Sequence, residues 1–239
     1  MIRVLVVGYG KMGKMIVETI EQRKDMKVVM IADHSNHPDV AQLQEPVDVI
    51  IDFSHPDNLS WILDFLHKQP CALVCGTTGY SDLQKRQIED LANQVPVIFQ
   101  ANFSQGIAVF QEILKLITPM LEDSFDMEIV EKHHNQKQDA PSGTAKLLAE
   151  IMNSEHTYKE VHGRNGFIGK RQKEIGIHAL RGGSVAGEHS VYFFGEDEIL
   201  EIKHTANSRK IFVNGAIKAA AFIVKQAPGM YTMKDILFA

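Results

Sequence analysis

The chain has 239 residues, of which 44% are hydrophobic and 23% are charged, with a formal net charge of -5. These values are typical of a globular protein with one large domain or two modest ones, and they exclude a disordered or fibrous chain. The negative balance gives no general attraction to nucleic acid or to an anionic membrane. No apolar run approaches the roughly 20 residues that cross a bilayer, and no secretion signal opens the sequence. We therefore expect a soluble, cytoplasmic protein.

The N-terminal apolar strand is followed at once by a glycine-rich turn. Gly8, Gly10 and Gly13 form the pattern G-x-G-x-x-G, and apolar residues then recur at helical spacing. A second strand over residues 27–32 leads to Asp33, twenty positions after Gly13. In this order the glycines let a pyrophosphate approach the backbone, the helix N-terminus favours its charge, and the acid can hold a ribose hydroxyl. The sequence predicts a dinucleotide site.

Alternation of strands and helices continues through the first hundred residues. It predicts an α/β fold with a Rossmann-like doubly wound parallel sheet. Small and polar residues follow three of the strands, and the carboxyl ends of parallel strands meet at one sheet edge, so these loops are expected to line the cofactor. Ordinary turn and capping chemistry is the alternative interpretation. The strands are expected at 2–7, 27–32, 47–52, 72–75 and 96–100, the helices at 58–68 and 82–93, and the loops at 53–55, 76–79 and 101–104.

A different pattern begins near residue 105 and predicts a second, α+β domain with an open mixed or antiparallel sheet. Its last three strands are read as an antiparallel meander. Segment 164–172 is read as a mobile connecting loop whose basic residues face solvent, with contact to a ligand as the alternative. A sheet covered by few helices favours burial against a second copy, so we expect an oligomer. Its helices are expected at 106–121 and 145–152 and its strands at 127–130, 174–180, 189–194 and 198–204, while an Ala-rich helix from residue 214 returns to the first domain.

Segment 131–144 gathers chemistry suited to a small anion. His133 and His134 can exchange protons near neutral pH, and Lys137 supplies a fixed positive charge. Ser142 stands where a new helix begins, so free backbone N–H groups would point at the same place. A carboxylate-bearing substrate would suit this arrangement. The alternative is that the histidines are ordinary loop residues and Ser142 only caps the helix.

Cysteine usage argues against a redox or metal role. Cys71 and Cys75 are the two cysteines, and they are four positions apart in an expected buried strand. This spacing differs from that of a redox or zinc pair, and strand geometry holds the two thiols too far apart for a disulfide. We predict reduced core thiols and no metal ion.

Several motifs together resemble the dihydrodipicolinate reductase (4-hydroxy-tetrahydrodipicolinate reductase) family over nearly the whole chain. The most specific is the string His-His-x-x-Lys-x-Asp-Ala-Pro-Ser-Gly-Thr. The motifs are found at residues 8–13, 76–80, 101–104, 131–144, 181–183, 187–189 and 204–209. The resemblance implies NAD(P)H-dependent reduction of a cyclic dicarboxylic imine, 4-hydroxy-tetrahydrodipicolinate, in lysine and diaminopimelate synthesis.

The resemblance also assigns roles to parts of the chain. It implies a dinucleotide-binding domain of residues 1–104 with 210–239, and a substrate-binding domain of residues 105–209 that builds a homotetramer. His133 would be the general acid/base and Lys137 the proton donor. Substrate carboxylate would be held by His134, Gly143 and Thr144, with Ser142 beside them. Cofactor contacts would come from Gly8, Tyr9, Gly10, Lys11, Met12, Gly13, Asp33, Gly76, Thr77, Thr78, Gln100, Ala101, Asn102 and Phe103.

The sequence leaves the choice between NADH and NADPH open. Asp33 suits the 2'-hydroxyl of NADH, whereas Lys11 or His34 can meet the 2'-phosphate of NADPH. We predict use of both cofactors. Two rival functions are another two-domain Rossmann reductase of amino-acid precursors, such as an aspartate or homoserine dehydrogenase, and a nicotinamide-sensing regulatory protein. The His-His-Asn-Gln-Lys string speaks against the first, and no visible DNA-binding or effector segment supports the second.

Overall fold

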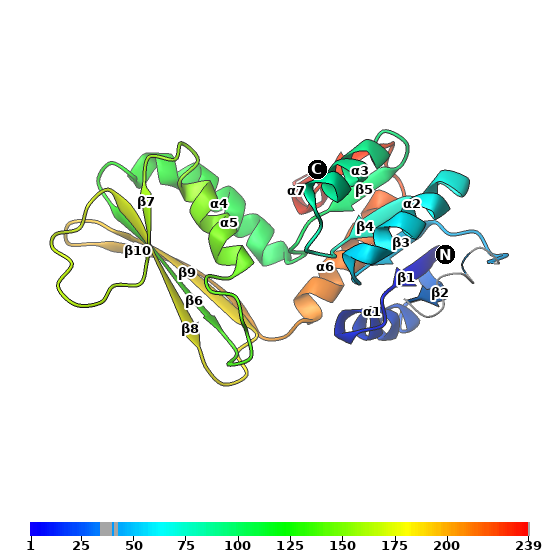
Figure 1. The fold of residues 1–239 in the computed structure, drawn as a ribbon, viewed down its shortest axis with the longest axis horizontal. Helices are drawn as coiled ribbons and strands as arrows, with labels where there is room; N and C mark the ends of the chain where they lie inside the picture. Colours follow the sequence, from blue (N-terminus) through cyan, green and yellow to red (C-terminus); the bar gives the residue numbers. More distant parts are fainter. Residues whose placement is uncertain (34–39, 41–42, 239) are drawn as a thin grey trace. The chain divides into compact units, whose positions relative to one another are not determined.

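The computed structural model describes residues 1–33, 40 and 43–238. The chain divides into two compact units, residues 1–105 with 210–239 and residues 106–209. Figure 1 shows the two units, each built around its own sheet. Within the described residues, no helix has the length and apolar character that a membrane crossing requires.

The first unit is built on a six-stranded sheet in the order β11-β5-β4-β3-β1-β2, with every neighbouring pair parallel. Buried apolar residues fill its central strands, as expected for a sheet covered on both faces. This arrangement confirms the doubly wound parallel sheet. Its strands are β1 (Ile2–Val7), β2 (Met26–Ala32), β3 (Val49–Asp52), β4 (Ala72–Cys75), β5 (Pro96–Phe99) and β11 (Gly229–Tyr231).

Helices cover the two faces of this sheet. Leu5 and Val7 belong to one core with apolar residues of α2 and α3, while α6 contacts α1, β3, β4 and β5. The chain therefore completes the first unit with a helix from its C-terminal part, as the sequence predicts. The helices are α1 (Lys11–Glu21), α2 (Leu59–Lys68), α3 (Asp82–Leu91), α6 (Lys210–Ile223) and α7 (Met233–Leu237), with a short 3-10 helix at Pro56–Asn58.

The order of strands creates a switch point between β1 and β3. The chain runs from β1 outward to β2 and then returns to the other side of β1, where it forms β3. In open parallel sheets, ligands bind in the crevice at such a point, beyond the carboxyl ends of the strands. The turns after β1, β3, β4 and β5 all lie at this edge because the four strands are parallel.

The second unit contains a five-stranded mixed sheet in the order β10-β9-β6-β8-β7. This confirms the mixed sheet that the sequence offered as one alternative. The predicted meander is correct for the antiparallel β9–β10 pair but wrong for β8, which pairs in parallel with β6 and β7; the β6–β9 pair is also antiparallel. Helix α5 lies between β6 and β8 in the chain, and such a crossover is what allows parallel pairing. The strands are β6 (Asp126–His133), β7 (Lys159–His162), β8 (Glu174–Arg181), β9 (Gly187–Phe194) and β10 (Ile199–Ala206).

Helices α4 (Gln105–Leu121) and α5 (Gly143–Met152) cover one face of the mixed sheet. Met127 and Ile129 point into this core, so Glu128 between them lies on the opposite face. There Glu128 binds Arg164 at 2.7 Å and Arg171 at 3.2 Å. Arg164 is exposed to solvent, as expected for the basic residues of loop 164–172, but it and the partly buried Arg171 also bind the sheet, which the sequence did not predict.

Candidate functional site

The glycine turn after β1 has the geometry that close ligand approach requires. Gly8 has a φ of 89°, and a β-carbon there would lie 2.8 Å from the carbonyl oxygen of Phe53. Gly13 packs as tightly, because its β-carbon would lie 1.9 Å from the carbonyl oxygen of Gly8. Gly10, by contrast, is exposed and would meet nothing within 4 Å. The outer two glycines hold the turn against the protein, while the middle one leaves open space at the start of α1.

The neighbouring loops are joined through a buried carboxylate. Asp52 ends β3, is fully buried, and accepts hydrogen bonds from the hydroxyl groups of Ser54 and Tyr80 and from the thiol of Cys75. Thr77 Oγ1 accepts the backbone N–H of Ser54 at 2.8 Å. Burial raises the pKa of Asp52, although these donors act in the opposite direction. The network holds the loops after β3 and β4 together at the switch-point edge.

The remaining residues expected at the cofactor are distributed along this edge. Tyr9, Lys11, Thr78 and Ala101 are exposed, whereas Met12, Asp33, Gly76, Gln100 and Asn102 are partly buried. His34 lies outside the described residues.

Two of these residues, Gln100 and Phe103, also make contacts that stabilise the first unit. The amide of Gln100 bonds the carbonyl oxygen of Asn102 at 2.7 Å and the N–H of Met233 at 3.2 Å. Phe103 is almost wholly buried and packs on Phe53 with ring centroids 5.3 Å apart. A cofactor at this edge would therefore meet the backbone of Phe103 rather than its ring.

In the second unit, the predicted anion site contains a buried cluster centred on Glu131. This side chain is inaccessible to solvent and receives the Nδ1–H of His133 at 2.6 Å. Arg181 donates to both carboxylate oxygens, at 2.8 and 2.7 Å, and the backbone N–H of Ser142 donates at 3.0 Å. Burial alone would raise the pKa of Glu131, but the bonds from His133, Arg181 and Ser142 together lower it to about 2. Glu131 is therefore ionised at neutral pH.

Ser142 begins α5 and has two side-chain partners. Its Oγ accepts the N–H of Ala145 at 3.2 Å, which makes it the helix cap, and it also lies 3.0 Å from Nε2 of His189. Gly143 is exposed, and a β-carbon there would meet nothing within 4 Å. Thr144 is partly buried in the same turn. The start of α5 thus offers an open approach to backbone N–H groups, which is what an anion needs.

The structure brings His133 and His189 together, and the centroids of the two rings lie 5.2 Å apart. Burial lowers the pKa of His189 to about 4, and the neighbouring charge of His133 acts in the same direction. His189 is consequently neutral at physiological pH.

Lys137 and His134 lie on the turn that follows β6. The backbone N–H of Lys137 bonds the carbonyl oxygen of His134 at 3.1 Å, and its ammonium pairs with Asp139 at 2.7 Å. This ion pair lowers the pKa of Asp139. Both predicted side chains are partly buried.

Sequence reasoning missed the contribution of Glu131, Arg181 and His189 to this cluster. All three fall within motifs that carry the family resemblance, at 131–144, 181–183 and 187–189. Their convergence depends on strand register, since β6 lies between β8 and β9. No spacing within one segment could have revealed it.

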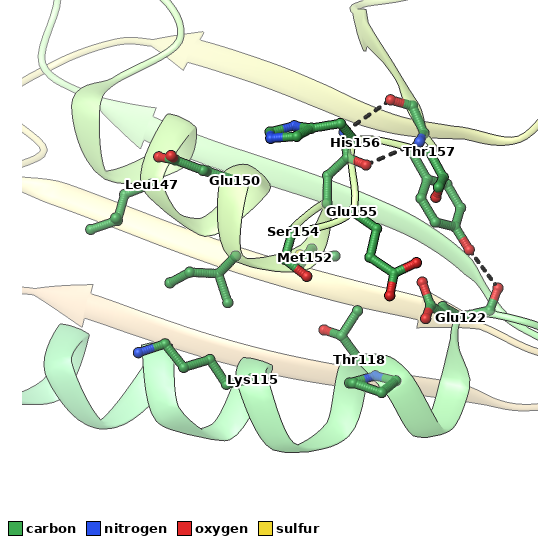
Figure 2. Close-up of a pocket in the computed structure, with 14 residues that line it drawn as sticks. Lys115, Thr118, Glu122, Leu147, Glu150, Met152, Ser154, Glu155, His156 and Thr157 are labelled. Carbon is green, nitrogen blue, oxygen red and sulfur yellow. Dashed lines mark hydrogen bonds between the residues drawn. The ribbon is translucent and has the colours of Figure 1, made fainter.

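A hollow in this unit lies between α4 and α5 at their C-terminal ends, and Figure 2 shows it. It has a volume of about 600 Å³ and includes Lys115, Glu122, Glu150 and Tyr158 in its lining. None of the predicted catalytic or substrate-binding residues lines it. Among the described residues, no group of three or more His, Cys, Asp or Glu side chains is placed to hold a metal ion.

Known proteins match both units of the chain. The family model "Dihydrodipicolinate reductase, N-terminus" matches residues 2–103, and "Dihydrodipicolinate reductase, C-terminus" matches residues 106–237. The 4-hydroxy-tetrahydrodipicolinate reductase of Brachyspira hyodysenteriae is 43% identical over 98% of this chain and 99% of its own length. That of Clostridium novyi is 42% identical over 95% and 94%. A solved structure, dipicolinate-bound dihydrodipicolinate reductase from Paenisporosarcina sp. TG-14, has a TM-score of 0.79 at 23% identity and covers 99% of both chains.

The parallel sheet, its glycine turn and these matches define a nicotinamide-dependent oxidoreductase with an N-terminal dinucleotide-binding part. The chain belongs to the dihydrodipicolinate reductase family. This confirms the resemblance seen in the sequence and displaces the rival dehydrogenase and sensor interpretations.

Proposed function

We propose that this enzyme reduces 4-hydroxy-tetrahydrodipicolinate to tetrahydrodipicolinate in lysine and diaminopimelate synthesis, with NADH or NADPH as the donor. One observation carries the proposal: His133 and the capped start of α5 are bound to the same carboxylate, that of Glu131. Acid/base chemistry and carboxylate binding are thereby held next to each other. The names of relatives that match over nearly the full chain support the choice of substrate.

The residues of the first unit fit a bound dinucleotide. The open space at Gly10 and the start of α1 suit a pyrophosphate, and Gly8 and Gly13 hold the turn in place. When bound, the reduced nicotinamide supplies the hydride. The proposed contacts are Gly8, Tyr9, Gly10, Lys11, Met12, Gly13, Asp33, Gly76, Thr77, Thr78, Gln100, Ala101, Asn102 and Phe103.

Both nicotinamide cofactors are proposed to serve. Asp33 directly follows β2, where an acid can bond the 2'-hydroxyl of NADH, and the exposed Lys11 can meet the extra phosphate of NADPH. The catalytic efficiencies kcat/KM of the two cofactors should therefore differ by less than about a hundredfold, or about 2.8 kcal/mol. Steady-state kinetics with each cofactor measures this ratio, and a larger difference would contradict dual use.

The second unit is proposed to hold the substrate and supply the proton. Backbone N–H groups of Gly143 and Thr144, with Ser142 and His134 beside them, would bind a carboxylate at the start of α5. Hydride addition to the conjugated imine leaves negative charge on the substrate, and an ammonium can neutralise that charge by giving up a proton. Lys137 is the proposed donor, and His133 is the proposed general acid/base.

We further propose that the enzyme is a cytoplasmic homotetramer assembled through its second unit. The face of the mixed sheet opposite α4 and α5 supports this proposal, because these helices pack on the other face. Light scattering on the purified protein would give the molar mass directly. A mass of one chain, 26.8 kDa, at working concentrations would contradict the tetramer.

The reaction can be tested with a coupled assay. Purified protein is mixed with pyruvate, aspartate semialdehyde and the synthase that condenses them, and oxidation of NADH or NADPH is followed at 340 nm, the ordinary absorbance of the reduced nicotinamide. Oxidation that requires every component is expected. His133→Ala and Lys137→Ala should each lose mainly turnover while their cofactor affinity is retained.

One outcome would contradict the proposed substrate, and another would contradict the proposed residue roles. Cofactor binding without any substrate-dependent oxidation would place the substrate elsewhere. Full turnover in both variants would remove the acid/base assignment while leaving the reductase intact.

A further inference from the structure

Glu131 is a buried carboxylate without a role in the proposed chemistry. Its side chain is fully inaccessible and cannot meet substrate unless the protein rearranges. Among the described residues, its donors come from three different segments: His133 on β6, Arg181 on β8 and the backbone of Ser142 at the start of α5. A charge that is removed from water and bonded on both oxygens is costly unless its partners are well placed. The position of Glu131 therefore fixes the positions of His133, Arg181 and Ser142.

The first consequence concerns the proton on His133. An ionised carboxylate can only accept hydrogen bonds, so Nδ1 of His133, 2.6 Å from it, must carry the hydrogen. In the neutral ring, Nε2 is then the free base. A β-carbon on Gly187 would lie only 3.1 Å from Nε2, so glycine there leaves space beside this nitrogen. Glu131 thus selects the tautomer whose reactive nitrogen faces that space.

The second consequence concerns the turn after β6. Arg181 neutralises Glu131 by binding both of its oxygens. It also donates a hydrogen bond of 2.7 Å to the carbonyl oxygen of Asp139. Asp139 in turn pairs with the ammonium of Lys137. One guanidinium therefore connects the carboxylate that orients His133 with the turn that carries Lys137. The planar, fixed fork of arginine suits such a connection better than lysine does.

We propose that Glu131 and Arg181 act as a pair of positioning residues, which hold His133 in its Nδ1–H tautomer and hold the Lys137 turn and the start of α5 around it. Neither side chain is expected to contact the reacting atoms. The kinetic part of this inference rests on the proposed roles of His133 and Lys137. The tautomer of His133 does not, since it can be observed without turnover.

The test begins with Glu131→Gln, which keeps the shape and removes the charge. The glutamine amide has one oxygen that accepts hydrogen bonds and one NH2 group that only donates them. It therefore cannot accept all the bonds that His133, Arg181 and Ser142 donate to the carboxylate, and the selection of the His133 tautomer is lost. We expect kcat to fall about a hundredfold, the ordinary contribution of a general acid or base, with cofactor affinity within about twofold of wild type. Glu131→Asp should recover part of the lost kcat.

Imidazole nitrogen spectra provide the direct readout. The His133 signal is assigned by its loss in His133→Gln, and at pH 8 the wild-type protein should show hydrogen on Nδ1. In Glu131→Gln the ring should move toward the Nε2–H form that a histidine side chain favours in water. Glu188→Gln is a matched control, because Glu188 on β9 pairs with Lys132 and Lys203 rather than with His133. Its kcat and His133 spectrum should equal those of wild type.

The outcomes separate the two proposals. An active wild type with an unchanged kcat and an unchanged His133 spectrum in Glu131→Gln would overturn the positioning role. If Glu131→Gln fails to fold, the wild-type spectrum still decides, since an Nε2–H tautomer of His133 would overturn the proposal. An inactive wild type would instead remove the proposed function, while the spectrum would continue to report on Glu131.

Discussion

Gly13 lies directly against Gly8, so that a β-carbon on Gly13 would stand 1.9 Å from the carbonyl oxygen of Gly8. The contact joins the first turn of α1 to the end of β1. Gly10, between them in the chain, has open space instead. The three glycines of one motif therefore differ in what they do: two serve packing, and one leaves room for a ligand.

This difference predicts different results for alanine at two of these positions. Gly13→Ala should lower the thermal midpoint by several degrees, because the methyl group forces α1 away from β1. Gly10→Ala should keep the wild-type midpoint and weaken NAD(P)H binding. Thermal unfolding and titration of cofactor fluorescence measure the two effects. Equal loss of stability in both variants would contradict the assignment.

Replacing Lys137 tests the proposed proton donor. Lys137→Met keeps an unbranched side chain one atom shorter and removes the ammonium. The kcat should therefore fall by roughly two to three orders of magnitude, while cofactor affinity is retained. Asp139→Asn removes the ion-pair partner but keeps the ammonium, and it should cost less than about tenfold. Stopped-flow and steady-state rates with both cofactors give these values. A larger loss in Asp139→Asn than in Lys137→Met would reverse the assignment.

His189 should make stability depend on pH. Burial first, and then the charge of His133, hold its pKa at about 4 in the folded state, against 6.5 unfolded. Because the unfolded chain binds the proton more readily, the stability is full above pH 6.5 and is lost as pH falls toward 4. From pH 7 to 4.5 the loss should be roughly 2 to 3 kcal/mol. Glu131, with its pKa of about 2, adds its own loss mainly below pH 4.5.

Unfolding in urea at several pH values measures this dependence. His189→Gln should be less stable at pH 7 but should lose little more on acidification to pH 4.5. The exposed His67 offers a control, since His67→Gln should follow the wild-type curve. A wild-type stability that is flat between pH 7 and 4.5 would contradict the prediction.

The two cysteines should be chemically silent in the folded protein. Both are free and buried, and burial raises the pKa of Cys71 to about 12 and raises that of Cys75 as well. The thiolate is the reactive form, so a disulfide reagent at pH 8 should react at least about a hundredfold more slowly than with the unfolded chain. Absorbance of the released thiol reports the rate. Rapid reaction of one thiol in the folded enzyme would show that its strand opens locally.

Much of the first unit could be predicted because its signals are local. The run from β1 through the glycine turn to α1 is written in consecutive residues, and buried strands such as β4 appear as uninterrupted apolar stretches. β11 was not predicted, since three residues with Gly229 give no strand pattern. The meander was only partly correct for another reason. The lengths of its strands were nearly correct, but the sequence does not show that β6 lies between β8 and β9 in the sheet.

The candidate site shows the same limit. Its histidines, lysine and helix start could be located because they fall within fourteen consecutive residues, 131–144. Arg181 could not be assigned, because it reaches Glu131 from fifty positions away through the parallel β6–β8 register. The contacts of Arg164 and Arg171 could not be predicted for the same reason, because both lie in a loop and their partner Glu128 lies on β6.

The return of α6 and β11 to the first unit has a consequence for synthesis on the ribosome. The sheet of that unit cannot acquire its β11 edge, nor can α6 cover β3 to β5, until residues 210–231 have been made. The whole inserted segment, residues 106–209, emerges earlier and is continuous. Because domains generally fold as units during synthesis, the insertion can reach its native state while the nascent N-terminal part still waits for its final helix.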